Sequence, residues 1–203
     1  MEKILVKIMR AYKVNGLLFF SIYFRRLINK IYNFIFLKKH HIRSDYSSYI
    51  YGIKYMKIQS VTFGRHCRIE MVPEYNNKKL NPCLKIGKRV SVGDRVHIGC
   101  ANYIEIGDDC LFASNIYISD HNHGIYKGEK QSSIFQLVIE RDLDYDKSVI
   151  IGKNVWIGEG AAVLPGSVIG DNAIIGANAV VIGEIPANAI AVGVPAKVKK
   201  IIM

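Results

Sequence analysis

The chain has 203 residues, enough for one ordinary domain and an appendage, and half of its residues are hydrophobic while 22% are charged. This composition excludes a disordered chain. The formal net charge of +11 is unevenly placed, because residues 1–43 hold ten basic residues and a single acid, Glu2. That segment is also rich in Leu, Ile, Phe and Tyr, which favours a membrane surface over nucleic acid, and no nucleic-acid motif lies nearby.

Residues 1–41 are expected to be helical, because apolar residues recur there at helical spacing, with a break at Asn15-Gly16. The apolar run 17–24 is too short to span a membrane, and Arg25-Arg26 follow it in place of a signal-peptide cleavage site. We therefore expect peripheral contact with the inner face of the membrane. The alternative is that these helices pack on the protein itself. The chain is divided into a basic helical region, residues 1–55, and a second domain, residues 56–203.

A six-residue rhythm dominates the second domain. An aliphatic residue recurs every six positions and is most often followed by glycine. The clearest run is Ile151, Ile157, Val163, Ile169, Ile175 and Val181. The same pairing occurs upstream between Ile86 and Phe112. A period of six matches neither a helix nor a plain alternating strand, and three sixes make one coil of a triangular prism. The repeat predicts a parallel β-helix whose coils bury their aliphatic residues against one another.

Three interruptions break this rhythm: after Ile69, after Ile98 and, longest, between Ile118 and Ile151. Loops on the outside of a solenoid are where function tends to lie. The longest loop, about residues 119–148, begins with the segment ISDHNHG, which holds two of the six histidines.

The four cysteines are Cys67, Cys83, Cys100 and Cys110, and no pair has CxxC spacing. No run of metal-ligand residue types surrounds them, so we do not expect a zinc site. A reduced, cytoplasmic compartment is the simplest interpretation.

Residues 84–202 resemble the C-terminal half of the hexapeptide-repeat O-acetyltransferases, the relatives of galactoside, maltose and nodulation-factor acetyltransferases, including those that decorate bacterial polysaccharides. The resemblance rests on NVWIG at 154–158, LPG at 164–166, and IPAN with VGVPAK at 185–197. It implies a left-handed parallel β-helix, a homotrimer, and acetyl-CoA bound in a groove between adjacent subunits. The first 55 residues lie outside this resemblance and are expected to form an N-terminal α-helical extension.

The resemblance also implies roles for single residues. The family's catalytic histidine lies at the start of the loop that precedes NVWIG, a place held here by His121. We expect only one histidine of the pair to face the cleft directly, with His123 contacting acceptor or solvent and Asp120 a possible orienting group for the imidazole. The positions that the resemblance assigns to acetyl-CoA are Trp156, Gly158, Ala177, Lys197 and Lys200.

Histidine suits this chemistry. A sugar hydroxyl is a poor nucleophile at neutral pH, so a base must take its proton as the oxygen attacks the thioester carbonyl, and the unperturbed pKa of histidine is about 6.5. The resulting oxyanion needs hydrogen-bond donors, which backbone N–H groups of the coils can supply. The γ-class carbonic anhydrases use the same prism with zinc held by three histidines, but His66, His97, His121 and His123 have no such spacing. No metal is expected.

Two departures from the family pattern concern substrates. Where many relatives carry Thr-Lys or Thr-Arg, this chain has Ile182-Gly183, so one acetyl-CoA contact is missing. The family's sugar-binding Asn and Asp fall near Gly93 and Ala101, which argues against a simple galactoside or maltose acceptor. The leading hypothesis is O-acetylation of a sugar in capsule, O-antigen or exopolysaccharide synthesis, on an acceptor that is possibly lipid-linked. N-acetylation of an amino sugar or small amine, and a non-catalytic β-helix used for assembly, stay open as alternatives.

Overall fold

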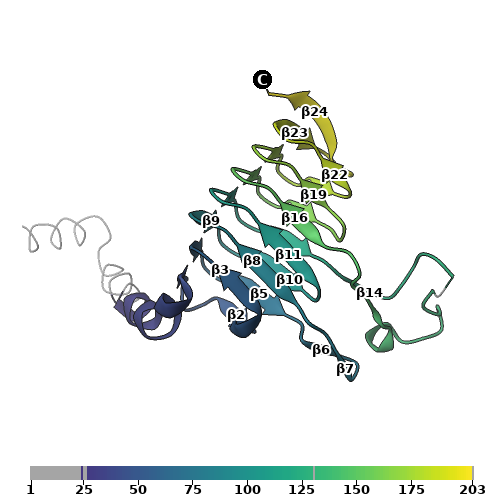
Figure 1. The fold of residues 1–203 in the computed structure, drawn as a ribbon, viewed down its shortest axis with the longest axis horizontal. Coiled ribbons are helices and arrows are strands. Elements are labelled where there is room, and N and C mark those ends of the chain that lie inside the picture. The colour runs from purple at the N-terminus through teal and green to yellow at the C-terminus, as the bar shows by residue number, and fades with distance from the viewer. Residues whose placement is uncertain (1–23, 25–26, 130, 203) are drawn as a thin grey trace, which may run out of the picture.

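The computed structural model describes residues 24, 27–129 and 131–202, so the helices expected before residue 24 lie outside the described part. Three sheets form the walls of a prism whose coils stack along one axis (Figure 1), and their strands are parallel except for the last one, Lys197–Ile201, which runs antiparallel to its neighbour. Sheet A runs in the order β1 (Ile42–Arg43), β4 (Val61–Phe63), β9 (Val90–Val92), β12 (Leu111–Phe112), β17 (Trp156–Ile157), β20 (Ile174–Ile175), β23 (Ala189–Val192) and β24 (Lys197–Ile201). Sheet B runs in the order β2 (Tyr49–Tyr51), β5 (Arg68–Met71), β10 (His97–Cys100), β13 (Tyr117–Ser119), β18 (Ala162–Val163) and β21 (Val180–Val181). Sheet C runs in the order β22 (Glu184–Ile185), β19 (Val168–Ile169), β16 (Val149–Ile151), β11 (Tyr103–Ile106), β8 (Cys83–Ile86) and β3 (Met56–Ile58).

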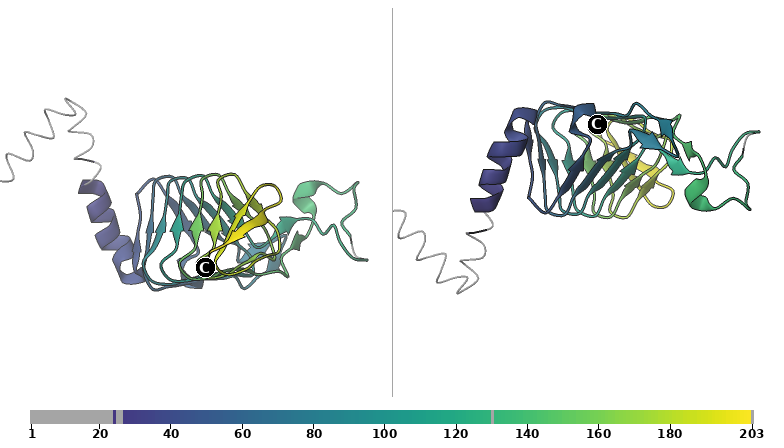
Figure 2. Two further views of the ribbon diagram at one scale, coloured as in Figure 1. Left: turned by 90° about the horizontal axis from the view of Figure 1, so that it is seen from above. Right: turned by 90° about the horizontal axis from the view of Figure 1, so that it is seen from below.

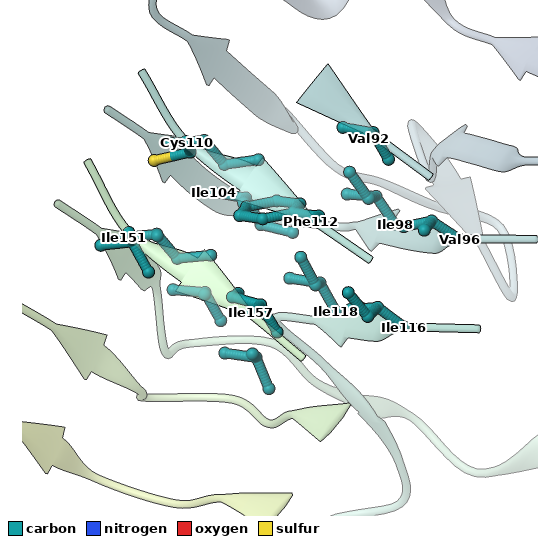
Figure 3. Close-up of a cluster of buried hydrophobic side chains, with 14 of the residues drawn as sticks. Val92, Val96, Ile98, Ile104, Cys110, Phe112, Ile116, Ile118, Ile151 and Ile157 are labelled. Carbon is teal, nitrogen blue, oxygen red and sulfur yellow. The ribbon is translucent and has the colours of Figure 1, made fainter. Parts of the chain in front are cut away.

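The six-residue rhythm sets the register of these sheets, and the predicted β-helix is confirmed. In sheet B, for example, Ile98 pairs with Ile118, and Ile118 pairs with Val163. Each is fully buried, and the aliphatic side chains of successive coils stack inside the prism (Figure 3). Each side chain therefore packs against its equivalents in the coils above and below, which is why one coil cannot be stable alone.

The corners of the prism use residues that tolerate left-handed backbone. Asn154, Asn172 and Asn188 all have φ between 54° and 60°, a conformation that asparagine adopts more readily than most residues. Their amides form a ladder, with Asn154 donating to Asn172 and Asn172 donating to Asn188, both at 2.9 Å. At another corner a Cβ added to Gly107 would come within 2.6 Å of the Gly152 backbone, so only glycine fits there.

The β-helix begins earlier than the sequence division near residue 55 suggested. β1 and β2 pair in parallel with β4 and β5, so the first coil starts at Ile42, inside the region expected to be helical. The signal is weak because this coil lacks the aliphatic–glycine pairs of later coils. Before it, helix covers residues 27–40 and ends in η1 (Asn33–Leu37) and η2 (Lys38–His40); a short helical turn, η3 (Ile53–Tyr55), follows β2.

The C-terminal end of the N-terminal helix is attached to the first coil, and the helix extends outward from the prism (Figure 2). Leu37 is buried, and the Asn33 amide makes two bonds with the Ser44 backbone, at 2.6 and 2.8 Å. One turn earlier, Asn29 donates to Asp45 at 2.7 Å. In the described part of the chain, no helix has the length and apolar character needed to cross a membrane.

Two hairpins leave the prism at its interruptions. They are β6 (Glu74–Tyr75) with β7 (Lys78–Lys79), and β14 (Asn122–His123) with β15 (Leu143–Asp144), both antiparallel. The second pair forms the base of the long loop, which carries one short helical turn, η4 (Val138–Glu140), and projects far from the coils (Figures 1 and 2).

Candidate active site

The outer face of sheet B forms the floor of the candidate site. Strand alternation points Ile69, Ile98 and Ile118 into the core, so their neighbours point outward. Two columns result from the register: Arg68, His97 and Tyr117 in one, and Glu70, Gly99 and Ser119 in the other. Polar and aromatic side chains therefore gather on one wall of the prism.

A cleft of about 520 Å³ lies over this floor, between the two hairpins. Its wall residues are predominantly polar or aromatic. They are Arg68, Glu70, Val72, Glu74, Tyr75, His97, Gly99, Tyr117, Ser119, His121, Asn122, His123 and Leu143. Hydroxyls, carboxylates, imidazoles and aromatic faces are groups that can bind a polar, hydroxylated ligand.

Asp120 is the buried anchor of the long loop. Its side chain has no exposed surface, and its carboxylate accepts backbone N–H groups of Ala101 at 2.8 Å and Asn102 at 2.9 Å. Burial of the Cys100 thiol and the nearby Asp120 carboxylate both raise the pKa of that thiol well above its usual range, so the thiol stays neutral. Asp120 is thus held in one position at the point where the loop leaves β13.

His121 lies against that anchor. Its Nδ1 is 2.9 Å from Asp120 Oδ1, and the Ser119 hydroxyl lies 3.3 Å from the same nitrogen. Because an ionised carboxylate only accepts hydrogen bonds, Nδ1 is the donor, and Nε2 of the neutral ring carries a free lone pair. The sequence left open which group orients His121, and the carboxylate in contact with its Nδ1 is that of its neighbour in the chain, Asp120.

Gly99 makes room for the ring of His121. A Cβ added at Gly99 would lie 3.3 Å from Cε1 of His121 and 3.7 Å from Nε2 of His97. The glycine in the middle of the floor therefore lets the imidazole lie directly on the sheet.

His123 also faces the cleft, which corrects the expectation that only one of the two histidines would do so. The centroids of the two histidine rings lie 6.3 Å apart, and both residues line the same cleft. Residues two apart in an extended segment lie on the same side of it, so the expectation of a single histidine was wrong.

The β6–β7 hairpin closes the other side of the cleft and contacts the long loop. Tyr75 Oη lies 3.1 Å from His123 Nδ1 and donates to the Ile139 carbonyl at 3.0 Å. Lys78 forms an ion pair of 2.7 Å with Asp142. Two segments that both interrupt the repeat are thus joined above the floor.

His97 stands between charged neighbours on the floor. Its Nε2 is 3.9 Å from Glu70, which is itself paired with Arg68 at 2.6 Å. Burial and the nearby Arg68 guanidinium lower the pKa of His97, with Glu70 acting in the opposite direction. The ring is therefore neutral at pH 7 and available for hydrogen bonding.

A second hollow, of about 460 Å³, shares Asn122 and His123 with the cleft. Leu164 and Pro165 of the LPG element and Ile182 give it an apolar side. The remaining wall residues are Tyr126, Lys127, Asp144 and Lys147. The base of the long loop is therefore flanked by a polar cleft and by a more apolar, lysine-edged hollow.

The model of the family described as bacterial transferase hexapeptide (six repeats) matches residues 148–183. The chain is 43% identical over 111 residues to the "Putative lipopolysaccharide biosynthesis O-acetyl transferase WbbJ" of Escherichia coli K12, a match that covers 55% of this chain and 57% of that protein. The chain is therefore similar to bacterial hexapeptide transferases and to an O-acetyltransferase. The matched stretch spans little more than half the length of this curated relative.

Solved structures of acyltransferases share this architecture. A maltose O-acetyltransferase from Clostridium difficile 630 superposes with a TM-score of 0.56 at 29% identity, covering 74% of this chain and 72% of its own. A galactoside acetyltransferase in complex with coenzyme A gives a TM-score of 0.50 at 26% identity, covering 71% and 63%. The N-acyltransferase AntD from Bacillus cereus, at 19% identity and a TM-score of 0.62 over 79% of this chain and 80% of its own, shares the fold.

The residues assigned by resemblance to acetyl-CoA lie apart from the cleft of the same chain. Trp156 is half exposed on sheet A, in register with Leu111 and Ile174. Lys197 and Lys200 are exposed on β24. One chain therefore does not bring these residues together with His121.

Gly158 and Ala177 touch each other at a corner between coils. A Cβ added at Gly158 would lie 2.6 Å from the Ala177 backbone nitrogen, so this glycine is required by coil stacking. Their assignment to acetyl-CoA remains a prediction.

Several residues of the cleft were not predicted, among them Glu70, Glu74, Tyr75 and Tyr117. They lie in or next to interruptions of the repeat, and the interruptions were the available signal. No three His, Cys, Asp or Glu side chains among the described residues converge in a way that could hold a metal ion.

Proposed function

We propose that the protein transfers an acetyl group from acetyl-CoA to a hydroxyl of a saccharide used for surface polysaccharide or lipopolysaccharide synthesis. The observation that carries the proposal is the 2.9 Å contact between His121 Nδ1 and the buried Asp120 carboxylate, at the edge of a polar cleft. The curated relative and the maltose and galactoside acetyltransferases support the substrate class.

In the proposed reaction, Nε2 of His121 removes the proton of the acceptor hydroxyl as that oxygen attacks the thioester carbonyl. Asp120 stabilises the imidazolium that forms, since its carboxylate holds Nδ1–H. The C–S bond then breaks, the proton passes from the imidazolium to the leaving thiolate, and the products are an O-acetyl ester and free coenzyme A. The acetyl acceptor occupies the cleft over sheet B.

The donor would bind at the base of the long loop. The second hollow offers Leu164, Pro165 and Ile182 to an apolar arm, with Lys127 and Lys147 near its rim for phosphate groups. Ile182 gives an apolar contact in place of the hydrogen bonds that Thr-Lys or Thr-Arg would provide.

The remaining donor residues would come from a second copy of the chain in a homotrimer. One outward-facing column on sheet A consists of Leu111, Trp156 and Ile174. Leu111 and Trp156 are about half exposed, as expected for side chains that become buried against another subunit. Light scattering is expected to give about three times the 22.9 kDa chain mass. A fully active monomer would contradict a shared site.

The N-terminal helix would hold the enzyme at the inner face of the membrane, near a lipid-linked acceptor. Ile31, Phe34 and Ile35 lie on one side of it and are 50–69% exposed. Lys30, Lys38 and Lys39 add positive charge in the same stretch, and each basic residue near an anionic surface contributes about 1 kcal/mol. Salt-sensitive co-sedimentation with anionic vesicles, lost on deletion of residues 1–41, is the expected result.

The activity is tested with purified protein, acetyl-CoA and a panel of methyl glycosides, with mass spectrometry of the products. The same panel includes amino sugars, which separate O- from N-acetylation. Ester products are expected. Products confined to amines would move the enzyme to the N-acetyltransferases, and no transfer to any acceptor would favour a non-catalytic scaffold.

A further inference from the structure

We infer that His123 binds a second hydroxyl of the acceptor, adjacent to the one that is acetylated, and that Tyr75 holds His123 in the tautomer needed for this contact. The inference rests on the proposed function and narrows its substrate class. The acceptor is a saccharide with a free hydroxyl next to the acetylated position.

The hydroxyl proton of Tyr75 determines the tautomer of His123. Tyr75 has a single O–H, and the Ile139 carbonyl, 3.0 Å away, can only accept it. The Tyr75 oxygen lies 3.1 Å from His123 Nδ1 and therefore accepts a hydrogen bond from it, so Nδ1 of His123 carries the hydrogen. In the neutral ring this leaves Nε2 with a free lone pair.

The two histidines present the same acceptor atom to the cleft. Both donate from Nδ1 and leave Nε2 free, both line the cleft, and their ring centroids are 6.3 Å apart. A hydroxyl has one hydrogen to donate, so two free Nε2 atoms accept from two different hydroxyls. Neighbouring hydroxyls of a saccharide ring provide such a pair of donors.

The partners of the two Nδ1–H groups differ, and this separates the roles of the two histidines. The Nδ1–H of His121 faces a buried carboxylate, which stabilises the charged ring after proton transfer. The Nδ1–H of His123 faces a neutral phenol oxygen, which gives no comparable stabilisation. His121 is thus suited to act as a base and His123 to accept a hydrogen bond.

The β6–β7 hairpin supplies the rigidity that this role requires. Besides Tyr75, its Asn76 donates to the Arg141 carbonyl at 3.3 Å and its Lys78 pairs with Asp142 at 2.7 Å. Three residues of one hairpin therefore fix the segment that carries His123. Tyr75 is a positioning residue, since it acts through His123.

The tautomer is tested by ¹⁵N NMR of the ring nitrogens in the full chain labelled at histidine, with His123→Gln to assign the signal. The expected result is the Nδ1–H form of neutral His123 in the wild type and a shift toward Nε2–H in Tyr75→Phe. The Nε2–H form in the wild type, or an unchanged tautomer in Tyr75→Phe, would overturn the role of Tyr75.

The acceptor contact is tested with a matched pair of variants and with methyl glycosides as probes. His123→Asn keeps an amide donor toward Tyr75 and removes Nε2, whereas His123→Gln places an amide oxygen near the lost Nε2. His123→Asn is expected to raise the acceptor KM about 3- to 10-fold, the loss for one hydrogen bond, with little change in kcat or in the KM for acetyl-CoA. His123→Gln is expected to raise the acceptor KM by a smaller factor.

On a monodeoxy glycoside that lacks the neighbouring hydroxyl, wild type and His123→Asn are expected to have the same acceptor KM. An unchanged KM in His123→Asn on the full glycoside, or a collapse of kcat, would reject this inference alone. Absence of transfer to every glycoside by the wild type would instead reject the proposed function.

Discussion

The coils between Val149 and Val181 and the long loop before them are built in opposite ways. In the coils the aliphatic residue of each hexad is fully buried in register with its neighbours. In the loop, Ile134 is 81% exposed and Phe135 is 92% exposed. The buried hexads stabilise the fold, whereas the candidate cleft lies over the outer face of sheet B where the inserted hairpins leave the prism.

The first prediction tests the contribution of core packing in a coil to stability. Ile157→Ala is expected to lower the free energy of unfolding by about 2–5 kcal/mol, because the buried methyl and methylene groups leave a cavity. Phe135→Ala in the loop is the matched control, and a change within about 0.5 kcal/mol is expected there. Chemical denaturation of both variants makes the measurement, and equal losses would contradict the division of roles.

The second prediction concerns the anchor of the loop. Asp120→Asn is expected to lower kcat by about 10²-fold, since the amide no longer stabilises a charged His121. The amide NH2 also replaces one of the two carboxylate oxygens and so faces the backbone N–H of either Ala101 or Asn102, which costs about 1–3 kcal/mol of stability. The rate is therefore measured at a temperature where the variant is fully folded. An unchanged kcat there would exclude the orienting role.

The third prediction sharpens the role of the glycine in the floor. Gly99→Ala is expected to lower kcat about 10-fold, because the new Cβ would press on the His121 ring at 3.3 Å. Gly99→Ser is expected to lower kcat further, while the KM for acetyl-CoA stays the same in both variants. A graded loss in kcat supports the placement of the ring, and wild-type rates in both variants contradict it.

The smallest expected effect is a pH dependence of stability from His97. Its pKa is lowered in the folded chain by burial and Arg68, so the unfolded chain binds the proton more readily. The contribution of His97 to stability is full above the unfolded pKa of about 6.5 and is lost as the pH falls from there through the folded pKa. His97→Gln should flatten this part of the stability curve. His66→Asn, at an exposed corner with φ of 55°, is the control.

The sequence predicted the regular part of the molecule well for a physical reason. Hexads from Ile151 to Val181 each bury one aliphatic residue, so their period is visible in a single chain. The coil that starts at Ile42 was missed because it lacks the glycines of that period. His121 was predicted from the resemblance and lies at the cleft, while its catalytic role stays a prediction.

The rest of the site depends on contacts that no local pattern carries. Tyr75 reaches His123 across 48 positions of sequence. Asp120, a possible orienting group in the sequence analysis, contacts His121 through the bend at the end of β13. The separation of Trp156 from the cleft follows from its place on sheet A rather than sheet B.

The central claim is that His121 is the base for acetyl transfer to a saccharide hydroxyl. Its most direct test compares kcat for transfer from acetyl-CoA to a methyl glycoside in wild type, His121→Ala and His123→Ala, with all three proteins folded by circular dichroism. We expect kcat to fall by a factor on the order of 10² to 10⁴ in His121→Ala and by a much smaller factor in His123→Ala. An active His121→Ala variant beside an inactive His123→Ala variant would contradict the central claim.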